Sequence, residues 1–132
     1  KTKLQLADEP QKYLYEPNAA IMKCGRVDDL QLTYPAKKIG EHSHLYTSEE
    51  LIANFPGRIF TVQTVLPLSK KQLTELIPSR KANISCRNFP AKPEEISKKI
   101  GFSPGGDHYL FATTLANGKK VIVHCLKAII AT

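Results

Sequence analysis

The residues best suited to metal chemistry in this 132-residue chain are two histidines, in the Glu-His-Ser-His segment at positions 41–44. Imidazole and carboxylate groups are usable zinc ligands, but zinc sites take three or four ligands at defined spacing. The other candidate ligands, Cys24 and His124, are distant in the sequence. The pattern therefore does not indicate a metal site, and we expect none.

The three cysteines could serve as nucleophiles or as disulfide partners. Cys24, Cys86 and Cys125 form no CxxC pair, and their odd number argues against a disulfide framework. Cys86 and Cys125 alternate with apolar neighbours, which is typical of buried small hydrophobic residues. Because nothing places a thiol beside a histidine, no catalytic cysteine is indicated. Free thiols favour a reducing, cytoplasmic setting.

Cofactor loops are not indicated either. The one glycine pair stands at positions 105–106, in the segment Ser103–Asp107, which we expect between a helix and a following strand. A nucleotide-binding loop has the opposite order, because its N–H groups begin a helix that follows a strand. There is also no GxSxG nucleophile elbow. We therefore expect neither catalytic residues nor a cofactor in this chain.

The charge distribution is more informative than these motifs. The net charge is +7, but residues 1–55 carry −1 and residues 56–132 carry +8. A strongly basic region favours a polyanionic partner such as nucleic acid. An ordinary, well-solvated basic surface is the alternative interpretation.

Six residues of the second half are candidates for RNA contacts, because they surround one predicted strand with a polar face. They are Arg80, Lys81, Asn83, Arg87, Asn88 and Lys92. Basic side chains bind phosphate oxygens through charge, and amides add directional hydrogen bonds. The pairs Lys98-Lys99 and Lys119-Lys120 are better explained by ordinary solvation. No aromatic stacking motif of the RRM type is present, which favours duplex or backbone recognition over reading of single strands.

The elements that must position these residues follow a β-α-β-α-β-β order. Strand patterns cover residues 59–66, 82–87, 108–115 and 119–126. Ser69 begins a helix that Pro78 ends, and a second helix begins at Pro93 and ends at Gly101. The pair Asn117-Gly118 predicts a type I′ hairpin turn, which needs positive φ at both residues. The expected fold class is α+β, a mixed sheet with helices on one face and polar positions on the other.

The first half predicts a smaller α+β segment. One helix begins at Asn18 and ends at Gly25, and a second covers residues 26–32. Residues 36–46 are expected to be extended. The Thr-Ser-Glu-Glu capping-box pattern at 47–50 predicts a short helix through Ile52. The Pro56-Gly57 pair is the expected boundary, which gives domains 1–55 and 56–132.

Membrane insertion and secretion are not indicated. No run approaches the roughly 18–20 apolar residues of a membrane-spanning helix. Residues 1–10 lack the apolar core of a signal peptide. Because the first residue is Lys1, we expect the chain to be a segment of a longer protein.

Five motifs in a fixed order carry a resemblance to a known family: Leu14–Lys23, His44–Ser48, Phe55–Arg58, Ala82–Pro90 and Gly106–Ala112. Together they resemble the C-terminal region of a bacterial, Bacteroidetes-type group of predicted class I S-adenosylmethionine-dependent methyltransferases. There a small ferredoxin-like segment precedes a THUMP-like domain, and the match covers nearly the whole chain. THUMP domains are associated with RNA-modifying enzymes, so the resemblance implies a parent RNA methyltransferase acting on tRNA or rRNA. The family's Rossmann-like domain has no counterpart here, which implies that S-adenosylmethionine binds in that missing domain.

The combined interpretation is an RNA-binding accessory region without catalytic residues of its own. Its expected partners are structured RNA, either tRNA or rRNA, and the missing methyltransferase domain. The alternative is a structural docking or dimerisation module whose polar face, with Asn83 and Arg87, packs on that domain or on a second copy. A third hypothesis, a small independent enzyme using His42, His44 or Cys24, needs a metal or a pocket.

Overall fold

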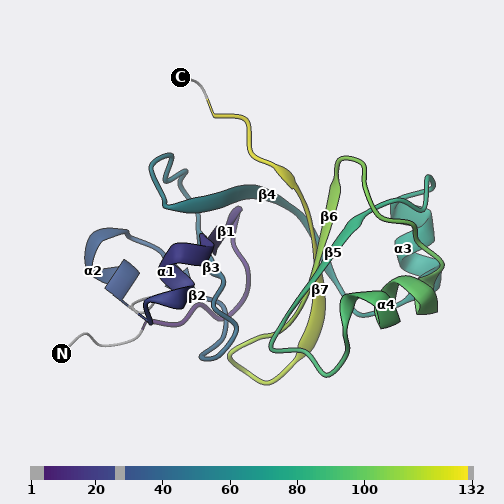
Figure 1. Ribbon diagram of the computed structural model, residues 1–132, viewed down its shortest axis with the longest axis horizontal. Helices are drawn as coiled ribbons and strands as arrows, with labels where there is room; N and C mark the ends of the chain where they lie inside the picture. Colours follow the sequence, from purple (N-terminus) through teal and green to yellow (C-terminus); the bar gives the residue numbers. More distant parts are fainter. Residues whose placement is uncertain (1–4, 26–28, 131–132) are drawn as a thin grey trace.

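The computed structural model describes residues 5–25 and 29–130, and its strands form one sheet (Figure 1). The elements in chain order are β1 (Tyr13–Pro17), α1 (Ala19–Lys23), α2 (Leu30–Thr33), β2 (Lys37–Lys38), β3 (Tyr46–Ser48), β4 (Gly57–Leu66), α3 (Lys70–Leu76), β5 (Asn83–Arg87), α4 (Pro93–Ile100), β6 (His108–Thr114) and β7 (Lys120–Lys127). The order across the sheet is β2-β3-β1-β4-β7-β6-β5. The α+β class is confirmed, with a sheet that runs through both halves of the chain.

Strand β4 joins the two halves of the sheet. It pairs antiparallel with β1 on one side and with β7 on the other. β6 is antiparallel to β7, and β5 at the edge is parallel to β6, so the sheet is mixed as predicted. The β-α-β-α-β-β order is confirmed for β4 to β7. In Figure 1, α3 and α4 lie together beside β5–β7, whereas α1 and α2 gather near β1–β3.

Helices α3 and α4 begin and end at the predicted signals. The Ser69 side chain accepts a hydrogen bond from the N–H of Gln72, Pro93 stands in the first turn of α4, and Gly101 ends it with φ 73°. Both helices pack on one face of the sheet through a buried cluster that comprises Leu66, Leu73, Ile77, Ala82, Ile96, Ile100, Phe102, Leu110, Ala112 and Ile122. No helix within residues 5–25 and 29–130 is long and apolar enough to cross a bilayer.

The opposite face of the sheet is less polar than predicted. Phe60, Phe111 and Val123, from β4, β6 and β7, are fully buried there beneath Ile39 and Leu45 of the first half. Only β5 presents a polar row on this face, and its residues are half-buried. The prediction of a polar second face was wrong for three strands because the first half of the chain supplies an apolar cover.

The hairpin between β6 and β7 is present, but its turn differs from the prediction. Gly118 has φ 87°, whereas Asn117 is not among the residues with positive φ, so the turn is not type I′. The Gly118 N–H donates to the Leu115 carbonyl at 2.9 Å, and the Asn117 side chain accepts from the Lys119 N–H at 2.9 Å. This turn satisfies the backbone groups of the hairpin with positive φ at Gly118 alone, whereas a type I′ turn needs positive φ at two residues.

In the first half, one helix prediction is confirmed and another is wrong. Asn18 caps α1 by accepting from the Ile21 N–H at 3.0 Å, and Gly25 follows with φ 72°. The capping-box helix at 47–52 does not form, because Thr47 and Ser48 belong to β3. Their hydroxyls donate to the carbonyls of Tyr13 and Glu50 instead. The helix predicted at 26–32 is described only as α2, since residues 26–28 lie outside the described residues.

Candidate nucleic-acid interface

The candidate site begins with the pairing of β1 and β4, which places Glu16 directly opposite Arg58. Directly opposed residues share one face of a sheet, so their side chains meet. The two strands approach unusually closely at Gly57, where an added Cβ would lie 2.0 Å from the Glu16 carbonyl oxygen. A glycine at position 57 is therefore required for this pairing.

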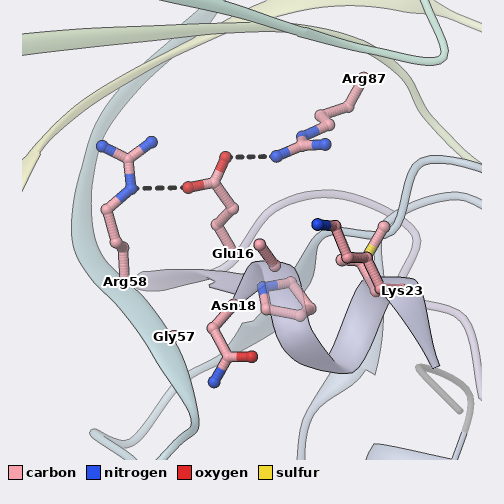
Figure 2. Close-up of a pocket in the computed structure, with 9 residues that line it drawn as sticks. Glu16, Asn18, Lys23, Gly57, Arg58 and Arg87 are labelled. Carbon is pink, nitrogen blue, oxygen red and sulfur yellow. Dashed lines mark hydrogen bonds and ion pairs between the residues drawn. The ribbon is translucent and has the colours of Figure 1, made fainter.

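Glu16 stands between two arginines (Figure 2). Its Oε1 accepts from Arg58 Nε at 2.6 Å, and its Oε2 accepts from Arg87 Nη2 at 2.6 Å. The carboxylate is buried, with 7% of Glu16 exposed, whereas the side chains of Arg58 and Arg87 are 47% and 33% exposed. One buried anion thus holds two partly exposed cations that come from different strands.

The protonation of Glu16 follows from this environment. Burial by itself raises the pKa of Glu16, but the hydrogen bonds and positive charges of Arg58 and Arg87 outweigh it. The pKa therefore lies below the ordinary value, and the carboxylate is ionised at neutral pH. The cluster keeps a net positive charge, because two guanidinium groups face one carboxylate.

An open cleft of about 820 Å³ lies beside this cluster. It is lined by Glu16, Pro17, Asn18, Ala19, Met22, Lys23, Gly57, Arg58 and Arg87. Three of the lining side chains are cationic and one is anionic. Its walls come from both halves of the chain, since α1 and the end of β1 face the start of β4 and the end of β5 (Figure 2). A cleft of this size and charge suits an anionic ligand of nucleotide dimensions.

The Arg58 guanidinium also contacts two aromatic rings. The Arg58 guanidinium lies over the rings of Phe60 and Tyr109, at 5.3 and 5.7 Å from their centroids. Lys127 lies over the Tyr109 ring as well, at 5.9 Å. Stacking of this kind restricts the orientation of a guanidinium and is favourable in its own right.

The six predicted RNA contacts are spread along β5 and on to the start of α4, and only one of them lines the cleft. Arg87 and Asn88 lie at the carboxyl end of β5, and Asn88 has φ 57°. Arg80 and Lys81 precede the strand, separated from the first pair by β5 itself, about 13 Å long at 3.3 Å per residue. Lys92 is exposed at the start of α4, where its N–H donates to the Glu95 side chain at 2.9 Å.

Asn83 is occupied by a structural role. Its amide donates to the carbonyls of Gly106 and His108, at 3.0 and 3.3 Å. The neighbouring Lys81 pairs with Ser103 in an isolated bridge, and its aliphatic stem lies against Gly106. The amino end of β5 therefore secures the turn before β6. Of the six residues, Arg87 alone lines the cleft.

Glu16, Lys23 and Arg58 are site residues that the sequence did not single out. Arg58 and Glu16 belong to two of the motifs that carry the family resemblance, Phe55–Arg58 and Leu14–Lys23. These motifs did not indicate a role for either residue. A buried carboxylate has no distinctive local pattern when its partners are 42 and 71 positions away.

The remaining reactive side chains in the part of the chain that the structure describes form no comparable site. His108 Nδ1 lies 2.8 Å from Nε2 of the buried His124. The pKa of His124 is lowered mainly by burial and to a smaller extent by the charge of His108. Burial raises the pKa of Cys125 and of Cys86. Within residues 5–25 and 29–130, no group of three or more His, Cys, Asp or Glu side chains could hold a metal ion.

Comparisons with known proteins place this geometry in a family. Residues 13–56 match a ferredoxin-like domain and residues 57–127 match a domain described as THUMP domain-like. A crystal structure of a "putative methyltransferase" from Porphyromonas gingivalis is 38% identical, with a TM-score of 0.90 over 97% of this chain. This chain covers 32% of that protein, about a third of its length. No curated protein matches. The resemblance seen in the motifs is confirmed, and the chain belongs to the THUMP-like family, with a ferredoxin-like domain before the THUMP-like one.

Proposed function

We propose that the chain is the RNA-binding accessory region of an S-adenosylmethionine-dependent methyltransferase that modifies structured RNA, either tRNA or rRNA. The observation that carries the proposal is the basic cleft, where Arg58 and Arg87 converge on Glu16 between the ferredoxin-like and THUMP-like domains. The THUMP-like family and the methyltransferase relative support it. The cofactor and the catalytic residues belong, in this proposal, to the remainder of a longer protein in the cytoplasm.

The chemistry of the cleft fits a phosphate backbone. Guanidinium groups bind phosphate oxygens through paired, charge-assisted hydrogen bonds, and Arg58 and Arg87 both reach the cleft wall. The +8 charge of residues 56–132 adds a long-range attraction for RNA. Arg80, Lys81, Asn88 and Lys92 would extend the contact along the backbone, and Asn83 would support the loop beside them.

The test is binding of unfractionated tRNA across a salt series, followed by fluorescence anisotropy. The affinity should fall more than about tenfold between roughly 0.05 and 0.2 M KCl, because each neutralised phosphate releases counterions. Arg87→Gln should weaken binding and reduce the slope of log affinity against log salt by about 1. Lys119→Gln, which removes the same charge from the exposed hairpin, should have a much smaller effect.

Two results would contradict the proposal. Wild-type protein that shows no salt-dependent affinity for tRNA would exclude an RNA-binding role for this surface. An Arg87→Gln variant indistinguishable from the Lys119→Gln control would instead favour the alternative, in which the cleft docks on the methyltransferase domain.

A further inference from the structure

The two arginines of the cleft retain most of their hydrogen-bonding capacity. A guanidinium group carries five N–H donors, and the Glu16 carboxylate accepts one from Arg58 and one from Arg87. No other described residue accepts a hydrogen bond from either side chain. Arg87 Nε is buried without a partner, so the donors free for a ligand are the remaining Nη groups.

The position of both arginines depends on Glu16. Each is a long side chain, partly exposed, and would otherwise sample many rotamers. Glu16 is nine-tenths buried and fixed by the pairing of β1 with β4, so its carboxylate is a rigid anchor. The stacking of Arg58 on Phe60 and Tyr109 adds a second constraint. Groups ordered before binding lose less conformational entropy when the ligand arrives.

We propose that Glu16 is a positioning residue that orders Arg58 and Arg87 to receive one phosphodiester group of the RNA in the cleft. The inference rests on the proposed RNA-binding function and identifies the residue that fixes the two arginines in one arrangement. Electrostatic repulsion alone would predict that removing the Glu16 charge strengthens RNA binding. The positioning role predicts the opposite, because Glu16 also arranges the arginine donors that bind the phosphate. Removing the negative charge should therefore weaken RNA binding.

The test compares Glu16→Gln with Glu75→Gln, which removes the same charge from the exposed face of α3. In about 0.15 M KCl, Glu16→Gln should bind unfractionated tRNA about tenfold more weakly than wild type, as expected for the loss of charge-assisted hydrogen bonds. Glu75→Gln should bind as tightly as wild type or slightly more tightly. Urea denaturation of both variants reports whether each remains folded.

A second measurement does not depend on the stability of the Glu16 variant. In the wild-type protein, the guanidinium N–H resonances of Arg58 and Arg87 should shift together when dimethyl phosphate, a single phosphodiester, is added. Arg58→Lys keeps the charge but loses the Nε bond to Glu16, so it should lose tRNA affinity and the Arg87 shift.

The outcomes separate this inference from the proposed function. Arginine resonances that do not respond together to dimethyl phosphate overturn the inference, and so does a folded Glu16→Gln variant that binds tRNA as tightly as wild type. If Arg87→Gln still weakens salt-dependent binding in those cases, the RNA-binding function stands without the positioning role. Wild-type protein that does not bind tRNA at all overturns both.

Discussion

Gly57 offers the most direct test of how the cleft is built. It pairs with Pro17 at the point where β4 begins and β1 ends. An alanine there would place its Cβ 2.0 Å from the Glu16 carbonyl oxygen, 2.9 Å from the Glu16 carbonyl carbon and 3.0 Å from Pro17 Cα. All three atoms are backbone, so no side-chain rotation can relieve the clash. The Gly57→Ala substitution must therefore separate the two strands.

The cost can be worked from these contacts. The strands must part by about 1.5 Å to reach an ordinary carbon–oxygen separation. That movement breaks the ladder hydrogen bonds at this end of the β1–β4 pair, each worth about 1 kcal/mol. It also moves Glu16 relative to Arg58. We expect Gly57→Ala to lower the free energy of unfolding by about 2–4 kcal/mol.

The assay is urea denaturation monitored by circular dichroism, with Gly25→Ala as the matched control. Gly25 has φ 72° and nothing within 4 Å of an added Cβ, so its substitution meets left-handed strain alone, about 1 kcal/mol. The midpoint of Gly57→Ala should fall well below that of Gly25→Ala. Equal midpoints would refute the close approach of β1 to β4.

Three further predictions concern titration and reactivity. Because the pKa of Glu16 is lowered in the folded protein, its ion pairs add stability above the ordinary carboxylate pKa, and this stability is lost as the pH falls through the folded pKa. The free energy of unfolding of Glu16→Gln should therefore fall less steeply with decreasing pH than that of wild type, and equal slopes would contradict this. The pKa of His124 is lowered from its ordinary value of 6.5, so the unfolded chain binds more protons than the folded protein just below that pH. The free energy of unfolding should therefore decrease as the pH falls below about 6.5, and the same decrease in His124→Gln would contradict this. Iodoacetamide should label the exposed Cys24 in the folded protein but Cys125 only after unfolding, and rapid labelling of folded Cys125 would show that burial does not protect it.

Local signals explain why the second half could be predicted. The start of α3 at Ser69, the start of α4 at Pro93 and its end at Gly101 each depend on residues within one helical turn. The alternation in β5, with Ile84 and Cys86 toward the helices and Arg87 on the other face, is equally local. Such patterns survive in a single sequence because the groups that satisfy one another are neighbours in the chain.

Strand β1 could not be predicted in the same way. Four of its five residues, from Leu14 to Pro17, are buried, so the strand shows no alternation of polar and apolar positions. Its pairing partners in β3 and β4, such as Tyr46 opposite Tyr15 and Phe60 opposite Leu14, lie at least 31 positions away in the chain. Thr47 was misassigned for a related reason, because a hydroxyl that suits a helix cap equally suits a contact with a neighbouring strand.

The site depended on the same long-range pairing. Charge counting placed Arg87 in the basic half of the chain and among the expected RNA contacts, whereas Glu16 lies in the half with a net charge of −1 and was not singled out. The fold places both on one cluster, across 71 positions of sequence. The polar character of Arg87 was predictable, but the partner that orders it was not.

The cleft also ties the ferredoxin-like domain to the THUMP-like one. Without residues 13–56, β4 would lose the strand that pairs with one edge, and Phe60, Phe111 and Val123 would lose the cover of Ile39 and Leu45. Burying a large apolar side chain contributes about 1.5–3 kcal/mol, so several such losses approach the 5–15 kcal/mol that stabilises a whole domain. The THUMP-like domain would then lack both Glu16 and a stable face on which to hold Arg58 and Arg87. In the proposed function, the ferredoxin-like domain is a structural part of the RNA-binding unit, because the strand β1 that pairs with β4 also supplies the Glu16 carboxylate between Arg58 and Arg87.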